Sequence, residues 1–262
     1  MPSHLKTLLT IAGSDPLGGA GIQCDIRCGS SLGLHVLTVI TAVTSQNSTG
    51  MVNLGVLDSK ILKSQLDAIL VDTMPDAIKI GLIGSLDNLS TIVDFLNGLS
   101  KNIPVVLDPI LKISADQHPS FHQNTSKEYL DSLVKYLIPL CSVVTPNLEE
   151  YEILKSGGGN FLDNCKSLII KGGHSSAKEI TDFLISKDLT LEKKHRKVEC
   201  KNLHGTGCAF SSFLASFLAL GYSLKDAFLM TSDKLFVIIE NSGNYSLGSS
   251  DYGPLNINKY FL

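Results

Sequence analysis

Residues 204–221 read HGTGCAFSSFLASFLALG, and this stretch decides the fold. Its apolar side chains recur at intervals of three and four residues: Phe210, Phe213, Leu214, Phe217 and Leu218. This period predicts a buried amphipathic helix. Two glycines and a threonine stand where the helix begins, and the first N–H groups of a helix lack partners inside it. Such a helix start, with no bulky side chain in the way, is suited to bind an anion.

Cys208 falls in the first turn of this predicted helix. The helix dipole is expected to lower the pKa of a thiol at that position. An anion cradle that contains an ionisable residue suggests phosphoryl transfer. The alternative is a buried structural thiol, because a Gly-x-Gly before a helix is a common pattern.

The composition restricts the class of protein. The chain has 262 residues, 44% of them hydrophobic, which is enough for one sizeable core over residues 1–262. The net charge of −3 and the lack of a Lys/Arg block argue against a nucleic-acid partner. Six cysteines without C-x-x-C spacing are typical of reduced thiols in a cytoplasmic protein. The apolar runs near the start and at residues 209–220 are too short for a signal peptide or a membrane span.

Short apolar runs alternate with helical patterns along the chain. The expected strands lie at residues 7–12, 36–43, 51–57, 77–83, 103–107, 142–145, 167–171 and 181–185. The expected helices lie at residues 22–32, 60–71, 86–99, 126–137, 148–155, 161–166 and 224–240. This alternation predicts an α/β fold with a mostly parallel sheet covered on both faces. Residues 188–199 are more polar and are expected to form an edge strand.

Glycine-rich and polar segments follow several of these strands. In open α/β sheets ligands bind beyond the carboxyl ends of the strands, so these segments are expected to converge on one cleft. A dinucleotide-binding fingerprint fails in the first loop, because Cys24 stands where a small residue is needed after Gly19 and Gly21. A Walker A sequence is missing as well, which leaves close backbone approach to a small ligand as the better interpretation.

Seven pieces of sequence, taken together and in order, resemble a known family. They are GSDP with GGAGIQCD (13–25), Gln46-Asn47, Lys79-Ile80-Gly81, Asp108-Pro109, Thr145-Pro146-Asn147, Lys171-Gly172-Gly173-His174 and HGTGC (204–208). The chain looks like the hydroxymethylpyrimidine/phosphomethylpyrimidine kinases of thiamine biosynthesis. The resemblance runs from about residue 7 to residue 256. It implies a ribokinase-like three-layer αβα sandwich with a central, mostly parallel sheet.

The resemblance implies a role for each residue of the Gly-Thr-Gly-Cys sequence. Cys208 occupies the position of the catalytic base, which would take the proton of a substrate hydroxyl as it attacks the γ-phosphoryl group of ATP. Gly205, Thr206 and Gly207 would donate to the charge on that group.

The same resemblance implies a pyrimidine site. Gln46 and Asp25 would hold the aminopyrimidine, since an amide offers both a donor and an acceptor and a carboxylate accepts. Gly13, Ala20, Leu82 and Ile110 would form the walls of the site. The alternatives are a solvated helix charge for Asp25 and a loop cap for Gln46.

The resemblance implies a metal and nucleotide site made of three strand-end residues and two helix residues. Asp108 and Glu150 are the candidate Mg²⁺ ligands, because hard oxygen donors suit that ion. Asn147, Lys171 and Lys234 are the candidates for ATP binding. The alternative for Glu150 is a capping box with Asn147, and the two lysines are equally typical of surface charges.

The chain departs from the family in the segment after Asp108. A Ser-Gly sequence is common there, whereas this chain has Lys112-Ile113-Ser114-Ala115, which leaves the closure of a substrate flap open. The resemblance implies an ATP- and Mg²⁺-dependent kinase that phosphorylates 4-amino-5-hydroxymethyl-2-methylpyrimidine and then its monophosphate, as a cytoplasmic homodimer with no membrane partner. The alternatives are a pyridoxal or pyridoxine kinase of the same fold and a catalytically silent pyrimidine-binding regulator.

Overall fold

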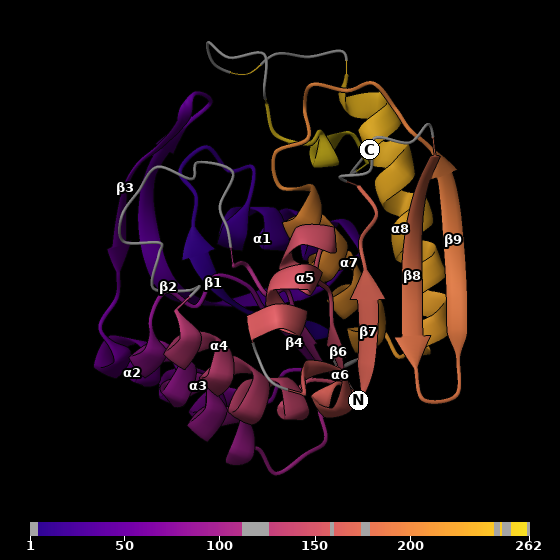
Figure 1. Ribbon diagram of the computed structural model, residues 1–262. Helices are drawn as coiled ribbons and strands as arrows, with labels where there is room; N and C mark the ends of the chain where they lie inside the picture. Colours follow the sequence, from indigo (N-terminus) through magenta and orange to yellow (C-terminus); the bar gives the residue numbers. More distant parts are fainter. Residues whose placement is uncertain are drawn as a thin grey trace.

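The computed structural model describes residues 5–111, 126–157, 160–173, 179–243, 247 and 253–260 (Figure 1). The strands are β1 (Thr7–Ser14), β2 (His35–Asn47), β3 (Gly50–Val56), β4 (Ala77–Ile80), β5 (Val105–Leu107), β6 (Val143–Val144), β7 (Ser167–Ile170), β8 (Glu179–Ser186) and β9 (Thr190–Arg196). The α-helices are α1 (Gly21–Ser31), α2 (Ser59–Asp72), α3 (Leu86–Asn97), α4 (Lys127–Ser132), α5 (Leu148–Gly157), α6 (Phe161–Asn164), α7 (Thr206–Ala219) and α8 (Leu224–Ser242). Short turns of other helix types are η2 (Leu133–Leu137), η3 (Ile138–Leu140) and η4 (Ile257–Tyr260).

One sheet joins all of these strands in the order β3-β2-β1-β4-β5-β6-β7-β8-β9. The six central strands, β2-β1-β4-β5-β6-β7, pair in parallel, whereas β3, β8 and β9 pair antiparallel. The predicted α/β class with a mostly parallel sheet is therefore confirmed. The polar strand β9 lies at the edge, as its sequence indicated, because an edge strand does not need two apolar faces.

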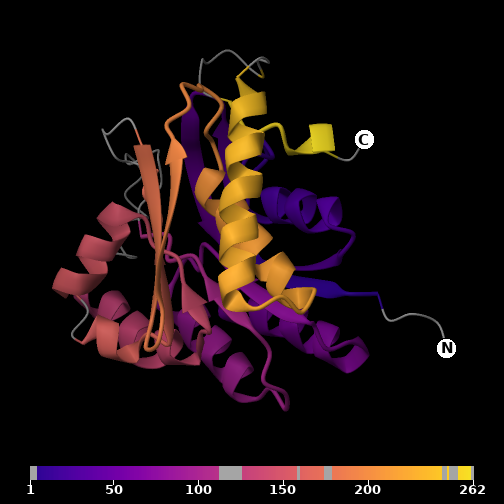
Figure 2. The ribbon, with the colours of Figure 1, turned by 90° about the vertical axis from the view of Figure 1, so that its right-hand side faces the viewer.

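Helices cover both faces of the sheet, which makes three layers (Figures 1 and 2). In β1 successive side chains point to opposite faces, so Leu9 and Ile11 pack into one core and Leu8 into the other. Helices α2 to α6 cover the first face, and α1, α7 and α8 cover the second.

Helix α7 lies at the centre of the second layer, against α1, α8 and the strands β1, β4 and β5. Phe210, Phe213 and Leu214 are almost completely buried there, as the apolar period predicted. Burial of each such side chain stabilises the fold by about 1.5–3 kcal/mol. The small side chains of Ser211 and Ser212 are buried on the same helix, where they meet carboxylates that are described below.

Strand β2 is longer than its apolar run predicts. It continues to Asn47 and forms a hairpin with β3, in which Gln46 pairs with Met51 beside an irregularity of the ladder. Residues 45–50 lie between the expected strands 36–43 and 51–57, but Ser45, Gln46 and Asn47 continue the ladder because β3 supplies the antiparallel partner. The alternative of Gln46 as a loop cap is therefore wrong.

Among the residues described, no helix combines the length and the hydropathy that a membrane span requires.

Candidate active site

The carboxyl ends of β1, β4, β5, β6 and β7 lie side by side in the sheet, and the amino end of α7 faces them (Figure 1). Gly205 caps α7 in the left-handed region, with a φ of 89°. A Cβ at Gly205 would come within 1.8 Å of the carbonyl oxygen of Gly19, so only glycine fits. The N–H of Thr206 donates to the carbonyl of Leu203, and the next donors of the first turn belong to Gly207 and Cys208.

Cys208 is buried at this helix start, with 7% of its surface exposed. Burial raises the pKa of its thiol to about 12; Lys79 opposes this effect, and the carboxylates of Asp108 and Asp25 add to it. The expected lowering of the thiol pKa by the helix dipole is therefore wrong for this conformation, because loss of solvation is the larger effect.

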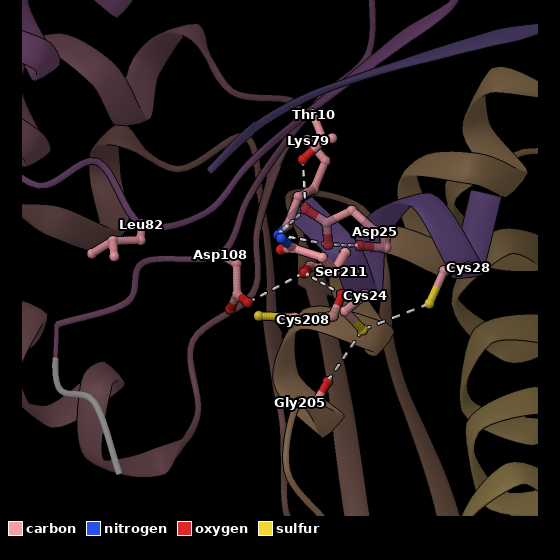
Figure 3. Close-up of polar contacts among 12 residues, drawn as sticks. Thr10, Cys24, Asp25, Cys28, Lys79, Leu82, Asp108, Gly205, Cys208 and Ser211 are labelled. Carbon is pink, nitrogen blue, oxygen red and sulfur yellow. Dashed lines mark hydrogen bonds and ion pairs between the residues drawn. The ribbon is translucent and has the colours of Figure 1, made fainter. Parts of the chain in front are cut away.

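A buried ion pair lies directly behind Cys208 (Figure 3). The Nζ of Lys79 on β4 is 2.9 Å and 3.0 Å from the two carboxylate oxygens of Asp25 on α1, and neither residue is exposed. The hydroxyls of Thr10 and Ser212 also donate to Asp25. Burial alone would lower the pKa of Lys79, but Asp25, followed by Cys208 and Asp108, raises it.

These contacts bear on the predicted role of Asp25. The alternative of a solvated helix charge is wrong, because the side chain is completely buried. Direct contact with a pyrimidine does not agree with this position either, since both oxygens already accept hydrogen bonds from protein groups. The geometry instead places Asp25 behind the site, as the partner of Lys79.

Asp108 and Lys171 form a second charged pair on the other side of Cys208. The Nζ of Lys171 is 2.7 Å from Oδ1 of Asp108, and the hydroxyl of Ser211 donates to Oδ2 at 3.2 Å. A Cβ at Gly207 would lie 3.3 Å from the Nζ of Lys171 and 3.8 Å from Oδ2 of Asp108. The glycine thus leaves open the space between the helix start, a cation and a carboxylate. Figure 3 shows the sulfur of Cys208 pointing toward Asp108.

Glu150 adds a further carboxylate. It forms a reciprocal capping box with Asn147: the N–H of Asn147 donates to Oε2 of Glu150 at 2.9 Å, and the N–H of Glu150 donates to Oδ1 of Asn147 at 2.8 Å. Burial raises the pKa of Glu150 to about 7, although Lys171 opposes the shift; Asp108 reinforces it. The capping alternative is confirmed, and the backbone N–H of Leu111 also donates to this carboxylate.

The donor set of Asp108 and Glu150 is suited to Mg²⁺. No group of three or more His, Cys, Asp or Glu side chains with metal-binding geometry occurs in the described part of the chain. Mg²⁺ in phosphoryl-transfer enzymes is typically held by one or two carboxylates, the remaining positions being filled by water and substrate phosphates. Asp108 and Glu150 are two buried carboxylates, which matches that pattern.

A third group of polar residues lies toward β2. The Nε2 of His204 is 2.9 Å from Oδ2 of Asp15 and 3.2 Å from Nε2 of Gln46. Backbone N–H groups of Leu17, Gly19 and Ala20 also donate to Asp15. Gln46, one of the predicted pyrimidine ligands, is partly exposed at the end of this chain of contacts.

The predicted walls of the pyrimidine site come together in part. A Cβ at Gly13 would come within 2.9 Å of Leu82, and Ile110 packs against the same small apolar cluster as Leu82. Ala20 stands at the beginning of α1, packs with Ile110 against the core of the second helix layer, and donates its N–H to Asp15. Whether these four residues contact a pyrimidine stays a prediction.

Lys234 does not contact the Asp108–Lys171 pair. Its Nζ lies 5.3 Å from the ring centre of Phe213, between α8 and α7, and burial lowers its pKa. Its role at the nucleotide stays a prediction. His174 and the expected flap at Lys112-Ile113-Ser114-Ala115 lie outside the described residues.

The sequence contains further site residues that its motifs did not single out. Asp15, His204 and Lys79 lie inside quoted motifs, whereas Ser211 and Ser212 look like ordinary small residues of a buried helix. Lys79 could have been found from the sequence, because it is a charged residue within an otherwise apolar strand. A buried charge of this kind needs a partner of opposite charge.

The model of the phosphomethylpyrimidine kinase family matches residues 15–256, which include Asp25, Asp108, Lys171 and Cys208. The chain belongs to the phosphomethylpyrimidine kinase family. A hydroxymethylpyrimidine/phosphomethylpyrimidine kinase of Staphylococcus aureus is 34% identical, and the match covers 96% of this chain and 93% of that protein. The family resemblance read from the motifs is therefore confirmed.

Solved structures agree with this family. A phosphomethylpyrimidine kinase from Clostridium difficile superposes with a TM-score of 0.70 at 32% identity, covering 88% of this chain and 97% of that one. The pyridoxal kinase of Staphylococcus aureus in complex with ADP superposes with a TM-score of 0.86 at 25% identity, covering 98% and 95%. The three-layer ribokinase-like fold is shared by this chain and both kinases.

Proposed function

We propose that this family member is an ATP- and Mg²⁺-dependent kinase that phosphorylates 4-amino-5-hydroxymethyl-2-methylpyrimidine and then its monophosphate. One observation carries the proposal: Gly207, in the first turn of α7, leaves open the space between Lys171, Asp108 and Cys208. A helix start, a cation and carboxylates at one point are what phosphoryl transfer requires.

Each charged group has a distinct task in this proposal. The N–H groups of Gly207 and Cys208, with the cation of Lys171, stabilise the negative charge of the transferred group. Asp108 and Glu150 would hold Mg²⁺, which neutralises phosphate charge when it is bound. Gln46 would hold the pyrimidine ring.

Cys208 would act as the base in the first phosphorylation. The hydroxymethyl oxygen attacks the γ-phosphorus, its proton passes to the sulfur of Cys208, and the bond to the leaving ADP breaks. The raised pKa of the thiol means that it is protonated at neutral pH in this conformation. We therefore expect the charges that stabilise the thiolate, those of Lys79 and Lys171, to outweigh those of Asp108 and Asp25 once a ligand neutralises Asp108.

The second phosphorylation makes a different demand. A phosphate monoester is largely deprotonated at neutral pH, because its second pKa is about 6. Its oxygen attacks without giving up a proton, so this step does not need the thiolate. One site can thus serve two acceptors, provided that the anion cradle accommodates an additional phosphate.

A second candidate function is pyridoxal phosphorylation, because the pyridoxal kinase of Staphylococcus aureus superposes closely on the whole chain. A substrate panel of the hydroxymethylpyrimidine, its monophosphate and pyridoxal with Mg-ATP, read by ADP release, separates the candidates. Turnover on the two pyrimidines supports the proposal, whereas turnover on pyridoxal alone would replace it. A silent regulator would bind the pyrimidine without releasing ADP.

The family resemblance supports two further proposals, a cytoplasmic location and a homodimer. Light scattering of the purified protein gives the mass of the assembly directly. A mass equal to one chain would contradict the dimer.

A further inference from the structure

Asp15, Gln46 and His204 come from three separate segments and meet at one ring nitrogen. Asp15 follows β1, Gln46 lies near the end of β2, and His204 precedes α7. The Nε2 of His204 is 2.9 Å from Oδ2 of Asp15 and 3.2 Å from Nε2 of Gln46. One nitrogen therefore faces a carboxylate and an amide at the same time.

The state of Asp15 decides which atom carries the hydrogen. Its Oδ1 accepts from the N–H of Leu17, and its Oδ2 accepts from the N–H groups of Gly19 and Ala20. Burial alone would raise the pKa of Asp15, but the hydrogen bonds from His204 and the backbone lower it. The carboxylate is ionised and can only accept, so Nε2 of His204 must be the donor.

A ring N–H that donates to Asp15 cannot accept a hydrogen bond from the amide of Gln46. The contact becomes favourable when the amide oxygen of Gln46, instead of its nitrogen, faces the ring N–H, which is then shared between two acceptors. We propose that Asp15 and His204 fix the amide of Gln46 in this orientation, so that its NH₂ group is presented to the substrate. His204 is thus a positioning residue that acts through Gln46.

The imidazole ring of His204 is held too tightly to turn away. A Cβ at Gly19 would come within 2.1 Å of Cδ2 of His204, so the loop packs directly on the ring. The backbone of His204 is fixed as well, by a hydrogen bond from its N–H to the carbonyl of Gly253 and a bridge to Pro254. A rigid donor is what sets the orientation of a neighbouring amide.

This inference rests on the proposed function and adds a rule for substrate choice. The fixed NH₂ group of Gln46 demands an acceptor, which the ring nitrogen beside the amino-bearing carbon of the pyrimidine provides. The second lone pair of the amide oxygen accepts from the exocyclic amine. A ring with C–H in place of that nitrogen leaves the NH₂ group without a partner, which costs affinity.

The test compares the hydroxymethylpyrimidine with its pyridine analogue, in which that one nitrogen is C–H. We expect wild type to prefer the pyrimidine by about 10–100-fold in kcat/KM, as for one hydrogen bond lost in a site. In His204→Phe the preference should fall below about threefold, with a raised KM for the pyrimidine and little change in the KM for ATP. A merely structural role would leave the preference intact. His195→Phe is the control, since His195 stacks on Phe236 at the far edge of the sheet.

Asp15→Asn is the second variant and carries the same prediction if His204→Phe does not fold, because it removes the charge that holds the ring tautomer. If a folded variant of either kind kept the full preference for the pyrimidine over the pyridine analogue, this inference would be overturned and the proposed function would stand. Equal use of both compounds by wild type would also overturn it. Failure of wild type to phosphorylate the pyrimidine would overturn the proposed function, and the inference with it.

Discussion

The Nζ of Lys79 lies 2.9 Å from Oδ2 of Asp25, and both side chains are completely buried behind the sulfur of Cys208. Such a pair contributes little net stability, since desolvation offsets most of the attraction. Its position suggests an electrostatic task, because Lys79 lowers the pKa of the Cys208 thiol and Asp25 raises it.

Lys79→Met should destabilise the protein by about 3–5 kcal/mol, because it leaves the charge of Asp25 buried without a partner. Urea unfolding monitored by circular dichroism measures the loss. Lys63→Met is the matched control: Lys63 and Asp67 form an exposed pair on α2, and its loss should cost at most about 0.5 kcal/mol. Equal losses in the two variants would contradict the account of the buried pair.

Gly205→Ala should prevent normal docking of α7 on the first loop, because the new Cβ would lie 1.8 Å from the carbonyl oxygen of Gly19. Gly221→Ala separates this clash from backbone strain, since Gly221 has a similar φ of 93° and nothing within 4 Å of its Cβ position. The control should lose only about 1–2 kcal/mol, whereas Gly205→Ala should lose distinctly more. The temperature midpoints of unfolding compare the two, and similar midpoints would argue against a packed contact.

Gly207→Ala should leave the fold intact and impair turnover. The new Cβ would stand 3.3 Å from the Nζ of Lys171, in the space that we assign to the transferred phosphoryl group. We expect kcat/KM for ATP to fall at least about tenfold, because the methyl group would displace the phosphoryl group from its position beside the donors. Activity equal to wild type in a folded variant would place the phosphoryl group elsewhere.

Glu150 should make stability depend on pH. Its pKa is raised from 4.5 to about 7 by burial, so the protonated form stabilises the fold. That contribution is complete below pH 4.5 and is lost as the pH rises through 7. Glu150→Gln, which stays neutral, should therefore match wild type near pH 4 and exceed its unfolding free energy by about 1–3 kcal/mol at pH 8.

The control for this titration is Glu149→Gln, on the exposed side of α5, which should change stability by less than about 0.5 kcal/mol over the same pH range. Urea unfolding at several pH values gives both curves. A wild-type curve parallel to that of Glu150→Gln from pH 4 to 8 would show that Glu150 is not perturbed.

The sequence was sufficient for the sheet, the helix α7 and the family, because these depend on local periodicity and on motifs in order. It was insufficient for Asp25, whose helix position is equally compatible with solvent, substrate or a buried partner. Only the packing of α1 against β1 and α7 brings Asp25 to Lys79 on β4. The raised pKa of the Cys208 thiol could not be predicted from the sequence for the same reason. Burial of the thiol depends on distant segments, and its effect outweighs that of the local helix dipole.

The most direct test is ADP release by wild type and Cys208→Ala with each of the two pyrimidines and Mg-ATP. The control Cys165→Ala alters a thiol near the end of α6, among residues of the opposite helix layer. We predict that Cys208→Ala reduces kcat on the hydroxymethyl compound by about 10²–10⁴-fold, as for loss of a general base, and affects the monophosphate much less. Unchanged turnover of the hydroxymethyl compound in a folded Cys208→Ala protein would contradict the claim that Cys208 is the base.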